Sequence, residues 1–222
     1  MNIFVRNLPM QILLVAATEM EIAPFVKDHP SADILITGVG IHAATYQLTK
    51  RIHQFDHDMI IQAGIAGTIH KQINPGKVFA VQADRFADIG IREKNQFKSL
   101  FDAKLAEEDS LPFTGGRLVN KSAYLQHCGL EVCDALTVNL VSDDPKEVFA
   151  QGAKYNALLE SMEGAAFHYV CLQEEVPFLQ IRSVSNVVGE RDKSKWFLQS
   201  SIANLCTELT RIFEELTKAH HI

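Results

Sequence analysis

The chain has 222 residues, of which 47% are hydrophobic and 22% are charged, and its formal net charge is −6. This composition is that of a globular protein and excludes collagen-like, low-complexity and disordered chains. The acidic balance gives the chain as a whole no electrostatic footprint for nucleic acid or an anionic membrane. Its length allows a core that needs no disulfide or metal for stability.

The beginning of the chain predicts no secretory or membrane segment. An apolar run over 12–17 is followed by Glu19 and Glu21 before any small-residue cleavage site, and nothing reaches the ~20 apolar residues of a membrane span. We therefore expect a cytoplasmic protein with a single domain over 1–222, in which residues 1–10 form an N-terminal extension.

The cysteines and histidines predict no metal site. Cys128, Cys133, Cys171 and Cys206 lack the C-x-x-C spacing of a zinc site and are too few for a secreted disulfide scaffold. Of the nine histidines, His53, His57, His220 and His221 are interpreted as solvated or tail residues and His168 as a packed helix residue. We expect reduced thiols, no metal and no cofactor.

Short runs that are apolar on both faces predict the strands of a mostly parallel sheet, because strands covered on both sides show continuous hydrophobicity. In chain order these runs are Ile12–Ala17, Ile34–Thr37, Met59–Ala63, Val78–Ala83, Leu136–Val141 and Phe178–Ser183. Helical patterns occur at 41–54, 163–174 and 194–219. This alternation predicts an α/β fold, a single-domain three-layer α/β/α sandwich with a mixed, mostly parallel central sheet. Residues 88–120 are rich in Lys and Glu, and we expect an excursion near the substrate or at a subunit contact.

A Gly-rich turn after the second predicted strand resembles a dinucleotide-binding motif. Residues 37–43 fit G-x-G-x-x-A, and Asp56 and Asp58 follow at about the distance of a ribose-binding acid. In a dinucleotide-binding fold that acid ends the second strand, whereas here both acids precede the strand that starts at Met59. An NAD-dependent enzyme therefore stays an alternative, which titration with a nicotinamide cofactor would test.

Small and polar residues also gather where other strands end. The turn over 64–67 would let backbone N–H groups approach a ligand at the carboxyl edge of the sheet. Glu21 follows the first strand, Glu163 stands at a strand-to-helix junction, and Asn186 follows the last strand. Tight packing, a helix-start acid or a turn residue explains each one alone, and only the combination suggests a site.

In this order the segments resemble the nucleoside phosphorylase and nucleosidase superfamily, and the match is close to the branch with methylthioadenosine/S-adenosylhomocysteine nucleosidase and futalosine hydrolase. The resemblance rests on Ala17–Glu21, Thr37–Gly40, Ala63–Gly67, Ser161–Ala165 and Ser183–Asn186, which span most of the chain. It implies an α/β/α sandwich around a distorted sheet, which cleaves the N-glycosidic bond of a purine nucleoside. It also implies a homo-oligomer.

The same resemblance implies residue roles. Glu21 matches the carboxylate that activates the attacking water, and Met162 and Glu163 match the pair that binds ribose. Asn186 matches the residue that meets the purine at N7 and position 6, with Ser185 as its neighbour. A carboxylate beside an oxocarbenium-like centre and a donor at the leaving base suit this cleavage. Further substrate-binding positions are Gly64, Ile65, Ala66, Gly67, Val138, Asn139 and Ser161.

Two departures from the family refine this prediction. Superfamily phosphorylases hold phosphate with arginines, one of them near the turn after the third strand, where this chain has 60–62 as Ile-Ile-Gln, so water is the expected nucleophile. Asn186 replaces the Asp of methylthioadenosine nucleosidases, and an amide NH₂ suits the two acceptors N7 and O6 of a 6-oxopurine. These features predict hydrolysis of a nucleoside with a hypoxanthine-type base. Within the branch that the chain resembles, this implies hydrolysis of futalosine, which carries a carboxyphenyl ketone, to hypoxanthine in menaquinone biosynthesis. Arg191 or Lys193 would meet the substrate carboxylate, or else belong to an exposed charged turn.

Three other functions stay open. They are a 6-aminopurine nucleosidase that acts on methylthioadenosine/S-adenosylhomocysteine or aminofutalosine, a purine nucleoside phosphorylase, and a non-catalytic purine-binding module. The presence of both Glu21 and Glu163 argues against the last, since binding a base requires neither. The expected partner is a small-molecule nucleoside, with no nucleic acid and no membrane.

Overall fold

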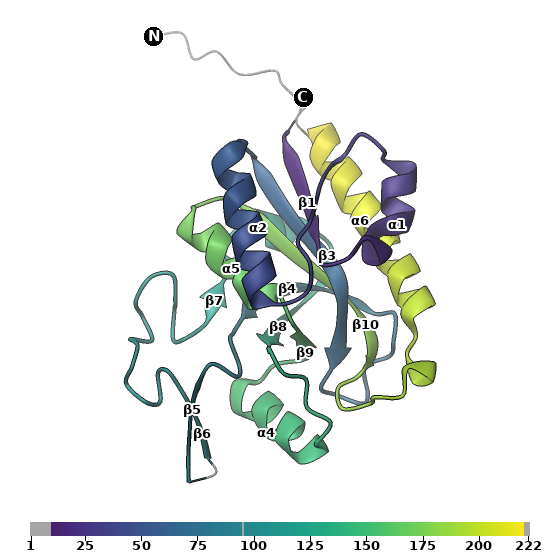
Figure 1. The fold of residues 1–222 in the computed structure, drawn as a ribbon. Coiled ribbons are helices and arrows are strands. Elements are labelled where there is room, and N and C mark those ends of the chain that lie inside the picture. The colour runs from purple at the N-terminus through teal and green to yellow at the C-terminus, as the bar shows by residue number, and fades with distance from the viewer. Residues whose placement is uncertain (1–9, 95, 220–222) are drawn as a thin grey trace, which may run out of the picture.

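The computed structural model describes residues 10–94 and 96–219. Within these ranges, eight strands form one sheet, in which seven follow the order β10-β4-β8-β9-β3-β1-β2 and β7 pairs with β4 (Figure 1). The strands are β1 (Ile12–Ala16), β2 (Asp33–Ile36), β3 (Met59–Thr68), β4 (Val78–Asp84), β7 (Leu118–Val119), β8 (Glu131–Thr137), β9 (Leu159–Ser161) and β10 (Phe178–Val187). Parallel pairs join β1 to β2 and β3, β3 to β10, and β8 to β4 and β9, whereas β10 with β4 and β3 with β9 are antiparallel. The predicted mixed sheet is confirmed.

The sheet closes on itself at one end. Strand β3 pairs with β9 on one side and with β10 on the other, while β10 also pairs with β4. Strands β3, β10, β4, β8 and β9 therefore form a ring, from which β1 and β2 continue as an open extension. Strands β3 and β10 are both ten residues long and pair in parallel over nearly their whole length, so their carboxyl ends lie side by side at one rim.

Helices cover both faces of the sheet (Figure 1). Helices α1 (Glu19–Asp28) and α6 (Leu198–Ala219) pack on one face, and α2 (Ile41–Gln54) and α5 (Gly164–Gln173) on the other. Successive residues of β1 point to opposite faces, so Leu14 enters the core under α1 and α6 while Leu13 enters the core under α2 and α5. The predicted three layers are present.

The helix predicted over 41–54 has these bounds in the structure, and the other two expected helices begin one and four residues later than their patterns. The strand predicted over Leu136–Val141 is wrong in its bounds. It starts at Glu131 and ends at Thr137. The Val138 amide completes the ladder by donating to the Ser161 carbonyl, and the following two amides leave it and donate to the Asp88 carboxylate.

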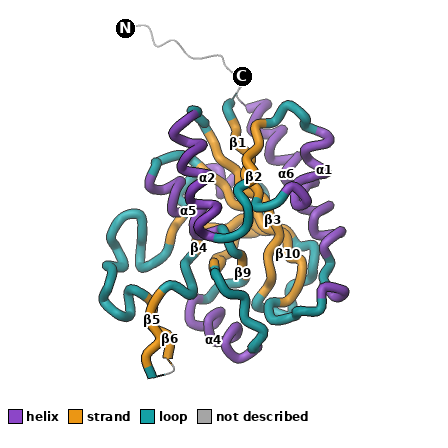
Figure 2. Tube along the Cα trace, viewed as in Figure 1, coloured by secondary structure: helices purple, strands orange, loops and turns teal. Residues whose placement is uncertain are grey.

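The expected excursion over 88–120 contains a hairpin of β5 (Gly90–Glu93) and β6 (Gln96–Ser99), which stands off from the sheet together with the loop that follows (Figure 2). The remaining helices are α3 (Ala123–His127), α4 (Pro145–Tyr155) and the short 3₁₀ turn η1 (Lys193–Lys195). Of the predicted N-terminal extension, residues 1–9 lie outside the described ranges, and Met10 is buried in the core. Among the described residues, none of the helices combines the length and apolarity that crossing a membrane requires.

Candidate active site

A cavity of about 450 Å³ opens at the rim where β1, β3, β9 and β10 end. Nine of the residues singled out in the sequence line it: Glu21, Ile65, Ala66, Gly67, Ser161, Met162, Glu163, Ser185 and Asn186. They come from four separate segments of the chain. The end-of-strand positions that the motifs suggested are therefore brought together in space.

Three predicted positions lie elsewhere. Val138 is buried in the hydrophobic cluster beside α4, and the Asn139 side chain donates to Asp88 outside the cavity wall. The prediction placed both in the pocket because the end of the corresponding strand lines it in the family that the chain resembles, and Val141 lines the cavity instead. Gly64 lies behind the wall, next to the side chains of Glu21 and Arg182.

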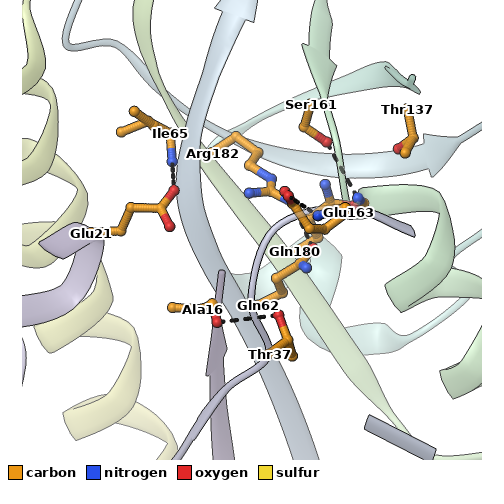
Figure 3. A network of polar contacts seen from close by, with 12 residues as sticks. Ala16, Glu21, Thr37, Gln62, Ile65, Thr137, Ser161, Glu163, Gln180 and Arg182 are labelled. Atoms are coloured by element: carbon orange, nitrogen blue, oxygen red, sulfur yellow. Dashed lines mark hydrogen bonds and ion pairs between the residues drawn. The ribbon is translucent and has the colours of Figure 1, made fainter. Parts of the chain in front are cut away.

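Glu21 is held by donors on both carboxylate oxygens. It lies in the first turn of α1 and is 6% exposed. Oε1 accepts from the backbone N–H of Ile65 at 3.0 Å, while Oε2 accepts from the backbone N–H and the hydroxyl of Thr18 at 3.0 and 2.9 Å. Figure 3 shows the carboxylate reaching from α1 across to β3. These contacts fix an acceptor at the cavity wall, as general-base chemistry requires.

Glu163 joins the Gly-rich turn to the site. It precedes α5, is 5% exposed, and accepts through Oε1 from the Gly40 backbone N–H at 2.9 Å. Gly40 has φ 98°, a left-handed conformation that glycine adopts without strain. The amide at the start of α2 that a pyrophosphate would use is thus occupied by a carboxylate, which argues against the dinucleotide alternative.

A buried arginine, which sequence reasoning missed, lies behind the two carboxylates. Arg182 of β10 is 1% exposed, donates to Oε1 of Gln62 at 2.8 Å, and has Nη2 at 4.0 Å from Oε2 of Glu163 (Figure 3). Burial raises the pKa of Glu163, although the Arg182 charge and the Gly40 amide act in the opposite direction. The sequence could have indicated this residue. Arg182 and Gln62 lie inside runs interpreted as strands buried on both faces, where a charged side chain needs a polar partner.

A polar network supports the start of α5 from below. The fully buried Asp84 accepts from the Thr137 hydroxyl at 2.8 Å and from the Gln180 amide at 3.3 Å, and Thr137 in turn accepts from the Ala165 backbone at 2.7 Å. A Cβ at Gly164 would overlap the Asp84 carboxylate. The small residue after Glu163 is therefore needed for close packing against this network.

The Asn186 amide has a defined orientation. The Ser185 hydroxyl donates to Asn186 Oδ1 at 2.8 Å, and Asn186 Nδ2 donates to the Val187 carbonyl at 3.0 Å. An amide nitrogen carries two hydrogens, so one N–H stays available to the cavity that Asn186 lines. Ser185 occupies the register shift between β10 and β3, which sets the two side chains next to each other.

The outer part of the cavity is lined by the segment after β10, including Arg191, Lys193 and Trp196. The Trp196 indole donates to the Glu190 carbonyl at 2.9 Å, and the Glu190 carboxylate pairs with Lys195. Neither Arg191 nor Lys193 forms an ion pair with another described residue. Two cations are therefore available at the entrance to the cavity.

A family model described as the phosphorylase superfamily matches residues 33–218. The chain belongs to the phosphorylase superfamily. This superfamily member is 29% identical to a futalosine hydrolase from Thermus thermophilus over 218 residues. The alignment covers 91% of this chain and 95% of that protein. It is also 29% identical over 164 residues to a 5'-methylthioadenosine/S-adenosylhomocysteine nucleosidase from Bacillus velezensis, covering 71% and 68% of the two chains.

Solved structures have the same fold. The nucleosidase of that name from Neisseria meningitidis, in complex with methylthio-immucillin-A, superposes with a TM-score of 0.77 at 18% identity, over 92% of this chain and 98% of that one. Futalosine hydrolase of Helicobacter pylori gives 0.76 at 16% identity, over 93% and 98%. The predicted family and the predicted fold class are confirmed. In the described ranges, no group of three or more His, Cys, Asp or Glu side chains is placed to hold a metal ion.

Proposed function

We propose that this superfamily member hydrolyses the N-glycosidic bond of a 6-oxopurine nucleoside, with futalosine as the substrate and hypoxanthine as the released base. The orientation of Asn186 carries the proposal. Its oxygen is engaged by Ser185 and its nitrogen has a free N–H at the cavity. That group donates to N7 or O6, both of which are acceptors in hypoxanthine, and so stabilises the leaving base.

The two carboxylates supply the rest of the chemistry. Departure of the base leaves an oxocarbenium-like sugar, which a nearby negative charge stabilises. Glu21, held by Thr18 and Ile65, accepts a proton from the attacking water, and Glu163 accepts from the ribose hydroxyls with Met162 beside the sugar. General-base catalysis of this kind is worth about 10²- to 10⁴-fold in rate, and the base, which leaves as an anion held by the Asn186 N–H, takes its proton from solvent.

Water is favoured over phosphate as the nucleophile. Both Glu21 and Glu163 line the inner cavity, so a phosphate there would meet two carboxylates. The buried Arg182 does not line the cavity, and its guanidinium faces Gln62 and Glu163. A nucleoside with a carboxylate on its 5' substituent is favoured by Arg191 and Lys193 at the entrance.

The relatives named as 5'-methylthioadenosine/S-adenosylhomocysteine nucleosidases support a second candidate, hydrolysis of a 6-aminopurine nucleoside. Membership of this superfamily also supports the predictions of a homo-oligomer and, through futalosine, of a place in menaquinone synthesis.

The test measures base release by chromatography from futalosine, its 6-amino analogue, methylthioadenosine and inosine, each with and without phosphate. We expect phosphate-independent release of hypoxanthine from futalosine, and a rate at least about 10²-fold lower in Glu21→Gln. Strict dependence on phosphate would contradict the hydrolase assignment, and preferential release of adenine would favour the second candidate.

A further inference from the structure

Glu160 is a cavity residue to which the proposed chemistry gives no role. It stands on β9, lines the cavity, and is 7% exposed. Among the described residues its carboxylate has neither a hydrogen-bond partner nor an ion-pair partner. Burial, followed by the negative charge of Asp88, raises the pKa of Glu160 to about 7. A carboxylate buried without a donor is costly, so a ligand that brings a donor would be stabilised here.

The sheet register places Glu160 opposite Asn186. Gly67 of β3 pairs with Glu160 of β9 on one side and with Asn186 of β10 on the other. Side chains of directly paired residues point to the same face of a sheet, and both of these side chains line the cavity. A Cβ on Gly67 would lie 3.6 Å from Nδ2 of Asn186, which puts the amide above the glycine.

Gly67 thus forms a flat floor between two polar side chains. Two strand spacings separate the backbones of Glu160 and Asn186, which is roughly 10 Å. That span accommodates a planar ring with one hydrogen bond at each edge, each about 2.9 Å long. A side chain on Gly67 would fill this space, since its Cβ would also lie 2.7 Å from Cγ2 of Val188.

We propose that Glu160 is a base-specificity residue that accepts a hydrogen bond from N1–H of a 6-oxopurine lying over Gly67, while Asn186 donates at the N7 and O6 edge. This inference rests on the proposed function. A 6-oxopurine is protonated at N1, whereas adenine has an unprotonated N1 that accepts. Because the pKa of Glu160 is about 7, its carboxyl is ionised above that pH and then only accepts, so it favours the first base and repels the second. Binding is therefore measured at about pH 8.

The role of Glu160 is separable from that of Asn186. The amide distinguishes the bases at position 6, and the carboxylate distinguishes them at position 1. A ring that satisfies only one of the two leaves a buried polar group unpaired at the other, which is how a site that hydrogen-bonds its ligand rejects close analogues.

The experiment measures binding of free bases by isothermal titration calorimetry, so that it does not depend on turnover. The probes are hypoxanthine, 1-methylhypoxanthine and adenine, and the proteins are the wild type, Glu160→Ala, Glu160→Gln and the matched control Glu190→Gln. Glu190 also lines the cavity but is paired with Lys195. Thermal melting of each variant checks the fold, and the isosteric Gln variant keeps the test valid if Ala destabilises the protein.

We expect the wild type to bind hypoxanthine about 10- to 100-fold more tightly than 1-methylhypoxanthine, which lacks the N1 donor. In Glu160→Ala this ratio should fall to within about threefold, with the loss carried by weaker hypoxanthine binding. Glu160→Gln should give an intermediate ratio, and Glu190→Gln should keep the wild-type ratio.

Two outcomes would overturn the inference, and they differ in what they mean for the proposed function. An unchanged ratio in folded Glu160→Ala and Glu160→Gln, with hypoxanthine still bound by the wild type, would remove the role of Glu160 and leave the 6-oxopurine assignment in place. A wild type that binds adenine more tightly than hypoxanthine would refute the proposed function itself and the inference with it.

Discussion

Replacing Gly64 by alanine tests whether the buried Arg182 guanidinium and the Glu21 carboxylate, which we propose as the base, need the space that a glycine leaves between them. A Cβ at this position would overlap Nη1 of Arg182 and lie 2.9 Å from Oε1 of Glu21. Gly64 has no unusual backbone angle, so the substitution acts only through these side chains.

The size of the effect follows from the geometry. Ordinary van der Waals contact begins near 3.4 Å, so Oε1 of Glu21 must move away by about 0.5 Å. The 3.0 Å bond from the Ile65 amide would then stretch to roughly 3.5 Å, beyond the normal range. A displacement of this order costs about 10- to 100-fold in kcat/KM, and the overpacked interior costs about 1–3 kcal/mol of unfolding free energy.

The assay compares kcat/KM for base release with the urea-unfolding free energy. Gly115→Ala is the matched control, because Gly115 has φ 56° and nothing within 4 Å of a Cβ. It should lose about 1–2 kcal/mol through backbone strain and keep its activity. A Gly64→Ala variant with activity within about twofold of the wild type would refute the positioning of Glu21 described here.

Two further predictions concern the groups around the site. Thr18→Val removes the hydroxyl that donates to Glu21 at 2.9 Å, and should lower kcat/KM about 5- to 10-fold in steady-state assays while Tm stays within a few degrees; an unchanged kcat/KM would contradict this. Burial raises the pKa of Asp84 from 3.8 to about 6. Between these pH values Asp84 is protonated in the folded chain and ionised in the unfolded chain, so the free energy of unfolding falls as pH rises. Asp84→Asn should therefore be about 3 kcal/mol more stable than the wild type above pH 6, as measured by urea titration, and the difference should vanish near pH 4. In the variant, Gln180 can turn its unpartnered Oε1 toward the new amide. Burial lowers the pKa of His168 from 6.5 to about 4, so both proteins should lose stability as pH falls between these values. In the wild type, proton uptake by Asp84 partly offsets this loss, so the variant should lose stability more steeply. A stability difference between the two proteins that does not change with pH would contradict the account.

The layers and most of the site could be predicted from the sequence because they depend on local patterns. Continuous apolar runs mark strands covered on both faces, and Leu13 and Leu14 do face opposite cores. The apolar positions that include Ala44 and Leu48 recur at helical spacing, and they predicted the bounds of α2 correctly because an amphipathic helix ends where its pattern ends. Glu21 and Asn186 were found because the ends of neighbouring strands meet at one rim.

What the sequence did not predict depends on contacts between distant segments. The strand around Leu136 was misplaced because the Asp88 carboxylate, from another loop, takes the amides that would have continued the ladder. Glu160 gave no signal, because its position opposite Asn186 follows from pairing of both strands with Gly67. Such pairing is set by the closed ring of strands.

The most direct test of the central claim is a competition in phosphate-free buffer between futalosine and its 6-amino analogue, each at the same concentration. Chromatography measures the ratio of hypoxanthine to adenine released by the wild type and by Asn186→Asp. We expect the wild type to favour hypoxanthine by at least about 10²-fold, and the Asp variant to lose that preference, because its carboxyl accepts from the 6-amino group. A wild type that releases mainly adenine, or equal preferences in the two proteins, would contradict the assignment of a 6-oxopurine nucleoside as the substrate.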